Sequence, residues 1–168
     1  MIKENIIKYR TRKNEKNRKA ETQLDFNQCK KIGIIIHENF EDEEKISSVI
    51  DELKALGKKI SKIYFLKKPM GLQMSPWFKA SQINLLGQVK SPELDHFLKQ
   101  KYDYLLCFDD TGNYIIDYIM SMVNSPSRIG LMKPERSYIF EMMIQVNGAG
   151  SGSSEILKYL KMIRSNGD

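Results

Sequence analysis

Polar side chains that could do chemistry follow two buried, strand-like runs of this chain. The first run, "KKIGIIIH" (30–37), leads into His37 and Glu38, and the second, "YDYLLCFDD" (102–110), ends at Asp109 and Asp110 and is followed by Asn113. Ligands of parallel α/β sheets bind beyond the carboxyl ends of strands, so neighbouring strands would bring these groups to one crevice. His37 could then act as a base near neutral pH, and the two aspartates could hold Mg²⁺ through oxygen.

The same residues have an ordinary structural interpretation, which weighs more heavily. Asp110 or Thr111 is a good N-cap for the helix predicted to follow. Residues 38–44 are an acidic helix entry, which suits the positive end of a helix dipole. We therefore predict no catalytic residue, no bound metal and no cofactor, and we keep the acidic crevice as an alternative.

Glycines alternate near the end of the chain in "NGAGSGSS" (147–154). A phosphate-binding P-loop requires a Lys after its last glycine, and a dinucleotide loop belongs to the first strand–helix turn, which here is the acidic "HENFEDEE". We interpret the stretch as a connector whose Ser151 or Ser153 caps the last helix, with an anion site as the alternative.

The net charge is concentrated at the N-terminus. Residues 1–19 hold eight basic and two acidic side chains, a difference that equals the formal net charge of +6 for all 168 residues. The remaining residues are therefore neutral as a group. Seven of these cations are candidate contacts for phosphate groups: Lys8, Arg10, Arg12, Lys13, Lys16, Arg18 and Lys19.

No large apolar residue lies between Tyr9 and Leu24. A helix in this segment would have no apolar face, so we expect it to take no part in the core and to be disordered or fraying until a partner neutralises it. In a helix, Glu15 could pair with Lys19 four residues later, or with Arg12 or Arg18 three residues away. We divide the chain into a basic arm (1–22) and a single domain (23–168).

The composition of the arm favours nucleic acid as its partner. An interfacial helix would carry Trp, Phe or Leu opposite its charges, and this segment does not, so we expect no membrane contact. Arg and Lys bind phosphates, and arginine-rich segments commonly fold on structured RNA. A solubilising tail without a partner, and an arm that binds an acidic protein, are the alternatives.

The rest of the composition is that of an ordinary globular domain. Hydrophobic residues make up 41% of the chain, and no apolar run approaches the roughly 18 residues that span a bilayer. Cys29 and Cys107 are far apart and have no metal-ligand spacing. We therefore expect a reducing, cytoplasmic location.

Alternating strand and helix patterns predict the fold class. Strands are expected at 30–37, 58–66, 102–110 and 127–133, and helices at 41–56, 91–102, 111–125 and 153–163. Residues 67–87 read as a loop with a short helical turn, and 138–146 are ambiguous between strand and helix. This order predicts an α/β three-layer sandwich on a mostly parallel, Rossmann-like sheet of four or five strands.

The layout resembles a small, uncharacterised bacterial α/β domain family, through the basic head, "IGIIIH", "LKALGKKI", "INLLG" and "YDYLLCFDD". That resemblance implies the fold but no activity. Residues 102–131 also look like a unit in the acceptor-side half of glycosyltransferases of the heptosyltransferase kind. Those enzymes need a second Rossmann-like domain for the sugar nucleotide, so this likeness implies a shared fold without shared chemistry.

Together these observations predict a non-enzymatic protein that binds structured RNA through its basic arm, with the ribosome as one candidate. The alternative is a small nucleotide- or sugar-nucleotide-binding domain, or an enzyme, that uses the acidic crevice.

Overall fold

The computed structural model describes residues 1–68, 75–147 and 150–164, and it contains one six-stranded sheet in which all strands run parallel. The strand order is β3-β2-β1-β4-β5-β6, so the chain reverses its direction of growth between β1 and β4. This is the strand order of doubly wound Rossmann sheets. The strands are β1 (Lys31–His37), β2 (Lys59–Phe65), β3 (Trp77–Phe78), β4 (Tyr104–Phe108), β5 (Ser127–Leu131) and β6 (Met142–Ile144).

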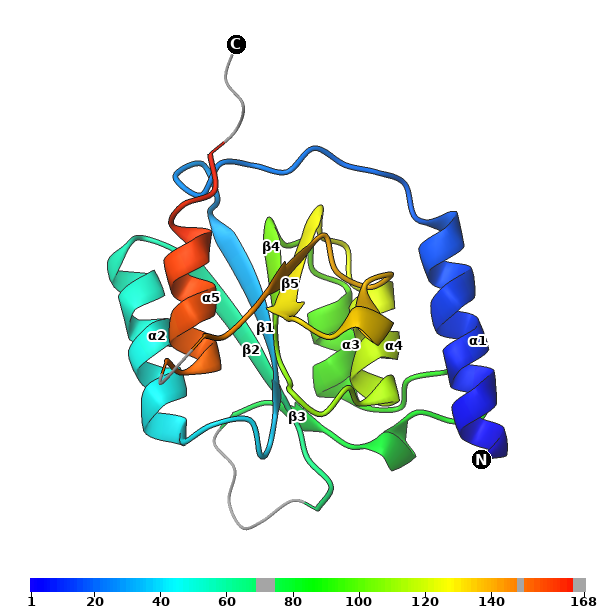
Figure 1. Cartoon of the computed structure of the whole chain (residues 1–168). Helices are drawn as coiled ribbons and strands as arrows, with labels where there is room; N and C mark the ends of the chain where they lie inside the picture. Colours follow the sequence, from blue (N-terminus) through cyan, green and yellow to red (C-terminus); the bar gives the residue numbers. More distant parts are fainter. Residues whose placement is uncertain (69–74, 148–149, 165–168) are drawn as a thin grey trace.

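Helices cover both faces of the sheet, which gives three layers (Figure 1). Helices α2 and α5 share a hydrophobic cluster on one face, and α1, α3 and α4 share a second cluster on the other. The helices are α1 (Ile2–Asn17), α2 (Glu43–Ala55), α3 (Pro92–Leu98), α4 (Tyr114–Met122) and α5 (Gly152–Leu160), with 3₁₀ turns η1 (Ala80–Gln82) and η2 (Pro134–Arg136). The predicted three-layer α/β fold is confirmed.

The two central strands carry the predicted crevice residues at their ends. In β1, six consecutive residues are buried, as the continuous β-branched run predicted, and β4 is buried along its whole length. Their register pairs Ile36 with Phe108, so His37 and Asp109 come next on adjacent strands. The two strands on which the crevice hypothesis depends are therefore neighbours in the sheet.

The sheet has more strands than the four or five predicted. The extra strand β3 lies in the segment predicted as a loop, where Trp77 and Phe78 pair with Tyr64 and Phe65. The ambiguous segment 138–146 contains β6, which pairs with β5. Both strands are too short to show a period of their own, which is why the sequence did not distinguish them.

The turns and caps near the ends of α2, α3 and α5 follow the sequence, whereas α4 is capped by Asn113 and not by Asp110 or Thr111 as predicted. Gly57, with φ of +79°, ends α2 in the left-handed region that glycine tolerates. Ser91 caps α3, and Ser151 caps α5 by accepting a hydrogen bond from the backbone of Ser154. Residues 148–149 of the predicted glycine connector lie outside the described residues.

Residues 2–17 form a regular helix that packs against α4 along one edge of the molecule (Figure 1). Ile7, just before the segment that lacks large apolar residues, is fully buried in the cluster that α1 shares with α3 and α4. Thr11, within that segment, is also buried, and its hydroxyl donates to the Ile7 carbonyl within the helix. No helix among the described residues is long and apolar enough to cross a membrane.

Candidate nucleic-acid interface

Polar contacts fix α1 on η1 near its start and on α4 near its end. Near its start, Lys3 Nζ donates to the carbonyl of Ala80 at 2.7 Å. Near its end, Asn14 Nδ2 donates to the hydroxyl of Ser121 at 3.0 Å. These contacts fix the rotation of α1 about its axis, and so determine which of its side chains face solvent.

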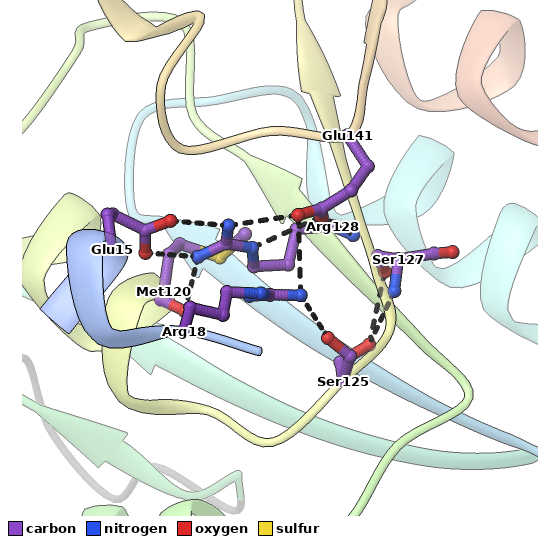
Figure 2. A network of polar contacts seen from close by, with 7 residues as sticks. All are labelled: Glu15, Arg18, Met120, Ser125, Ser127, Arg128 and Glu141. Carbon is purple, nitrogen blue, oxygen red and sulfur yellow. Dashed lines mark hydrogen bonds and ion pairs between the residues drawn. The ribbon is translucent and has the colours of Figure 1, made fainter. Parts of the chain in front are cut away.

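A buried arginine holds the C-terminal turn of α1 (Figure 2). Arg128 in β5 is 1% exposed, and its guanidinium binds both carboxylate oxygens of Glu15, with Nη2 to Oε2 at 2.7 Å. Its Nη2 also donates to Glu141 Oε1 at 3.0 Å. Burial lowers the pKa of Arg128, but the hydrogen bonds to Glu15 and Glu141 outweigh it and leave the pKa above its ordinary value. The guanidinium is therefore charged, and Glu15 and Glu141 balance its charge.

Arg18, just after the helix, extends the same network. It donates to the carbonyl of Ser125, and its Nη2 lies 3.3 Å from Glu141 Oε1. Arg18 thus contacts the domain rather than solvent alone. The local pairs predicted for Glu15 are replaced by the long-range pair with Arg128, because a bidentate, buried partner is stronger than exposed neighbours on a helix.

The docked helix divides the predicted phosphate contacts into two groups. Arg10 and Arg18 are half-buried, and Arg10 lies beside Gly87. The other five are exposed: Lys8, Arg12, Lys13, Lys16 and Lys19. Within α1, the spacing of the first four places them on one side of the helix.

We call Lys8, Arg12, Lys13 and Lys16 the basic stripe. Tyr9 is exposed between them, with 68% of its surface accessible. Eight residues of helix separate the first cation from the last, which corresponds to about 12 Å along the axis. Glu4 contacts Lys8 at 2.7 Å, an exposed i,i+4 pair that is worth little in water. The stripe is thus a fixed row of solvated cations on a helix that the domain holds in place.

The crevice residues, in contrast, are engaged in the fold itself. Asp109 is fully buried, and its Oδ1 accepts hydrogen bonds from the backbone and the hydroxyl of Thr111, while Oδ2 accepts from the backbone of Asn113. Oδ2 also lies 3.1 Å from Arg136 Nη1. Burial raises the pKa of Asp109, but the Thr111 hydrogen bond and the Arg136 charge outweigh it, so the pKa lies below its ordinary value.

Three of the remaining crevice residues, His37, Glu38 and Asn113, accept hydrogen bonds from nearby backbone groups. His37 is buried, its ring lies 5.7 Å from that of Phe65, and its Nδ1 accepts a hydrogen bond from the backbone of Asn39. Glu38 accepts from the backbone of Lys67 at 3.0 Å. Asn113 caps α4 by accepting from Ile115, and Asp110 is exposed. In the described part of the chain, no group of three or more His, Cys, Asp or Glu side chains could hold a metal ion.

Two helix N-termini at this edge of the sheet already hold a carboxylate of the chain. Asp109 occupies the backbone donors at the entry to α4. Glu41 does the same for α5, where its Oε1 accepts from the backbone of Ser153 at 3.2 Å. A helix N-terminus attracts phosphate through free N–H groups and the helix dipole. Here those donors are satisfied internally, which disfavours a nucleotide phosphate at either place.

Sequence reasoning missed Glu15, Arg128 and Glu141, the residues that position the basic stripe. Their signal in the sequence is weak. Arg128 is a charged residue inside a predicted strand, and Glu15 is one of two acids in the basic segment. A buried charge requires a partner, so Arg128 predicts an acid nearby without saying which one.

The comparison with family profiles agrees with the first resemblance seen in the sequence, that to an uncharacterised domain family. No curated protein matches this chain. The sequence profile of DUF6913, described as a family of unknown function, matches residues 3–163 and therefore includes α1 as well as the sheet. The chain belongs to the DUF6913 family.

Proposed function

We propose that this protein is a non-enzymatic binder of structured RNA, which it contacts through the basic stripe on α1. The observation that carries the proposal is the division of the cations: Arg18 is used to dock the helix, whereas the stripe faces solvent. Because the domain already holds α1 as a helix, binding does not require the segment to be ordered first, and this lowers the cost of association.

The basic stripe is a better candidate for binding an RNA backbone than the acidic crevice is for binding a nucleotide. Cations in a row about 12 Å long can reach several successive phosphates of an RNA helix, whose recognition rests on shape and backbone contacts. The strand order would favour a nucleotide at the β1–β4 edge, but the carboxylates of Asp109 and Glu41 occupy the helix N-termini there. The reducing, cytoplasmic location expected from the two isolated cysteines makes the ribosome one candidate for that RNA.

The test must keep the fold intact. Deleting residues 1–20 would remove the buried Ile7 and leave Arg128 without Glu15, so such a truncation confounds folding with binding. A better variant replaces all four residues of the stripe, Lys8, Arg12, Lys13 and Lys16, by Gln. A matched control removes four exposed lysines near α2 and α5: Lys45, Lys54, Lys59 and Lys158.

Lysates containing each protein are sedimented through sucrose gradients, with and without ribonuclease. Wild type and the control should travel with RNA particles and return to the top after ribonuclease, whereas the stripe variant should stay at the top. If the stripe variant travels with the particles, the proposal is wrong. Particles that survive ribonuclease would identify an acidic protein as the partner instead.

A further inference from the structure

A cavity of about 220 Å³ lies beside the basic stripe, between α1, the start of α4 and the turn after η2. Lys8 and Arg12 of the stripe line it from α1, Tyr114 and Asp117 from α4, and Tyr138 from the turn. Glu135 of η2 lines it as well, so the cavity joins two cations of the proposed RNA surface to two aromatic rings and two carboxylates.

The volume limits what can enter. At about 30 Å³ per water molecule, the cavity corresponds to roughly seven waters. Pockets for whole drug-sized ligands start at about 300 Å³. The space thus suits a single ring system rather than a complete nucleotide cofactor.

The polar group that the cavity offers is an acceptor. Arg136 also lines it, but its guanidinium donates to Asp117 Oδ1, to the carbonyl of Asp109 and to Cys107 Sγ, and it forms ion pairs with the carboxylates of Asp109 and Asp117. Both contacts of the Asp117 carboxylate within the described residues use Oδ1, so Oδ2 keeps its capacity to accept. Burial raises the pKa of Asp117 more than Arg136 lowers it.

Tyr138 gives the cavity a stacking surface near solvent. Its side chain is 40% exposed, and Lys8 and Arg12 are close enough to act electrostatically on its hydroxyl. RNA-binding proteins commonly take up unpaired bases by stacking them on aromatic rings and bonding their edges.

We propose that this cavity receives one unpaired base of the RNA bound by the basic stripe. The base stacks on Tyr138 and donates an exocyclic amino hydrogen to Asp117 Oδ2, while Lys8 and Arg12 contact its flanking phosphates. Adenine, cytosine and guanine carry an exocyclic amino group and uracil does not, so the cavity prefers a bulged adenine, cytosine or guanine over a bulged uracil. The inference rests on the proposed function, and it narrows the partner from structured RNA to RNA with an unpaired nucleotide beside a duplex.

The test uses full-length protein and three RNA hairpins that differ only in one position: fully paired, with one bulged adenine, or with one bulged uracil. Affinities are measured by fluorescence anisotropy at one salt concentration for wild type, Tyr138→Ala and Tyr138→Phe. Tyr159→Ala, in α5 on the other face of the sheet, is the matched control for loss of a partly exposed tyrosine.

Wild type should bind the adenine bulge most tightly. Tyr138→Ala should lose about 10-fold in affinity for that hairpin and little for the paired one, because base stacking on an aromatic ring is worth that order. Tyr138→Phe should keep the preference, since the ring is retained, and Tyr159→Ala should match wild type.

Equal affinities of wild type for the three hairpins would overturn the inference while leaving the proposed function in place. So would a loss in Tyr138→Ala that is the same for paired and bulged RNA. If wild type binds none of the hairpins, and the stripe variant sediments like wild type, the proposed function fails and the inference falls with it.

Discussion

Glu15 and Arg128 lie 113 residues apart in the chain and form a bidentate ion pair that joins the N-terminal helix to β5, next to the edge strand of the sheet. Only 2% of the Arg128 side chain and 11% of the Glu15 side chain are exposed. A guanidinium in such a place needs its carboxylates, because an unpaired buried charge is costly. The pair therefore makes α1 a part of the domain rather than an appendage.

Glu15→Gln should lower the free energy of unfolding by about 3 kcal/mol, the low end for a broken buried ion pair, because Glu141 still contacts Arg128. Urea denaturation followed by circular dichroism measures the change. Glu4→Gln, which removes an exposed acid from the same helix, should unfold with the midpoint of wild type. Equal midpoints for the two variants would show that the pair does not stabilise the fold.

The RNA affinity of Glu15→Gln shows whether binding depends on the position of the basic stripe or only on the net charge of the protein. The variant carries one more net positive charge, which by itself would strengthen binding to phosphates. If Glu15 positions the basic stripe, affinity for a structured RNA should fall instead, because α1 is less firmly docked. A rise in affinity would mean that charge alone governs binding.

Ile7→Ala should lower the free energy of unfolding by about 3 kcal/mol, because the Ile7 side chain is fully buried in the cluster that α1 shares with α3 and α4. The matched control is Ile2→Ala, in the same helix, where 76% of the side chain is exposed. Thermal unfolding of the two variants measures the difference. Indistinguishable melting temperatures would show that packing of Ile7 against the domain does not stabilise the fold.

Asp109 predicts a specific dependence of stability on pH. Its pKa is lower in the folded protein than in the unfolded chain, so the folded state binds this proton more weakly. The resulting stabilisation is complete above the unfolded pKa of about 3.9 and is lost as pH falls through the folded value. The difference in free energy of unfolding between wild type and Asp109→Asn should therefore be largest at neutral pH and shrink below about pH 4.

Comparison of variants is needed here because Asp117, whose pKa is raised by burial, changes stability in the opposite direction. Asp110→Asn removes an exposed neighbouring acid and should follow the wild-type curve across the pH range. A constant difference between wild type and Asp109→Asn would contradict the ionised pair with Arg136.

Salt dependence tests how many cations of the stripe touch phosphate. Each contact contributes about 0.7 to 0.9 to the slope of log affinity against log salt concentration. Replacing Lys13 and Lys16 by Gln should reduce that slope by about 1.5, whereas replacing Lys45 and Lys54 should leave it unchanged. Two equal reductions would indicate a general charge effect rather than a defined surface.

The sequence predicted those features that depend on neighbouring residues. The buried run of β1 and the apolar spacing of α2 both follow from local periodicity, and the α/β class follows from their alternation. The segment of β3 is different, because two residues become a strand only through their pairing with Tyr64 and Phe65. Such pairing is a tertiary event with no local pattern.

The same limit applies to the candidate site. Charge counting located the basic segment, but it could not distinguish the half-buried Arg18 from the exposed Lys16. That distinction depends on the docking of α1, and docking depends on Ile7 and on the pair between Glu15 and Arg128. Rules for helix neighbours assigned Glu15 to nearby cations, because no sequence rule connects positions 113 residues apart.

The separation of Glu15 and Arg128 along the chain also affects when α1 can dock during synthesis. At about 5 to 20 residues per second, synthesis of the 113 residues that follow Glu15 up to Arg128 takes roughly 6 to 23 seconds. Throughout that interval the N-terminal segment has left the peptidyl-transfer centre but has no partner for its acid, and a 16-residue helix alone is marginal in water. Helix α1 is thus synthesised before β5 but is held in place only afterwards, and a nascent chain carries the cations of α1 unfixed until β5 is complete.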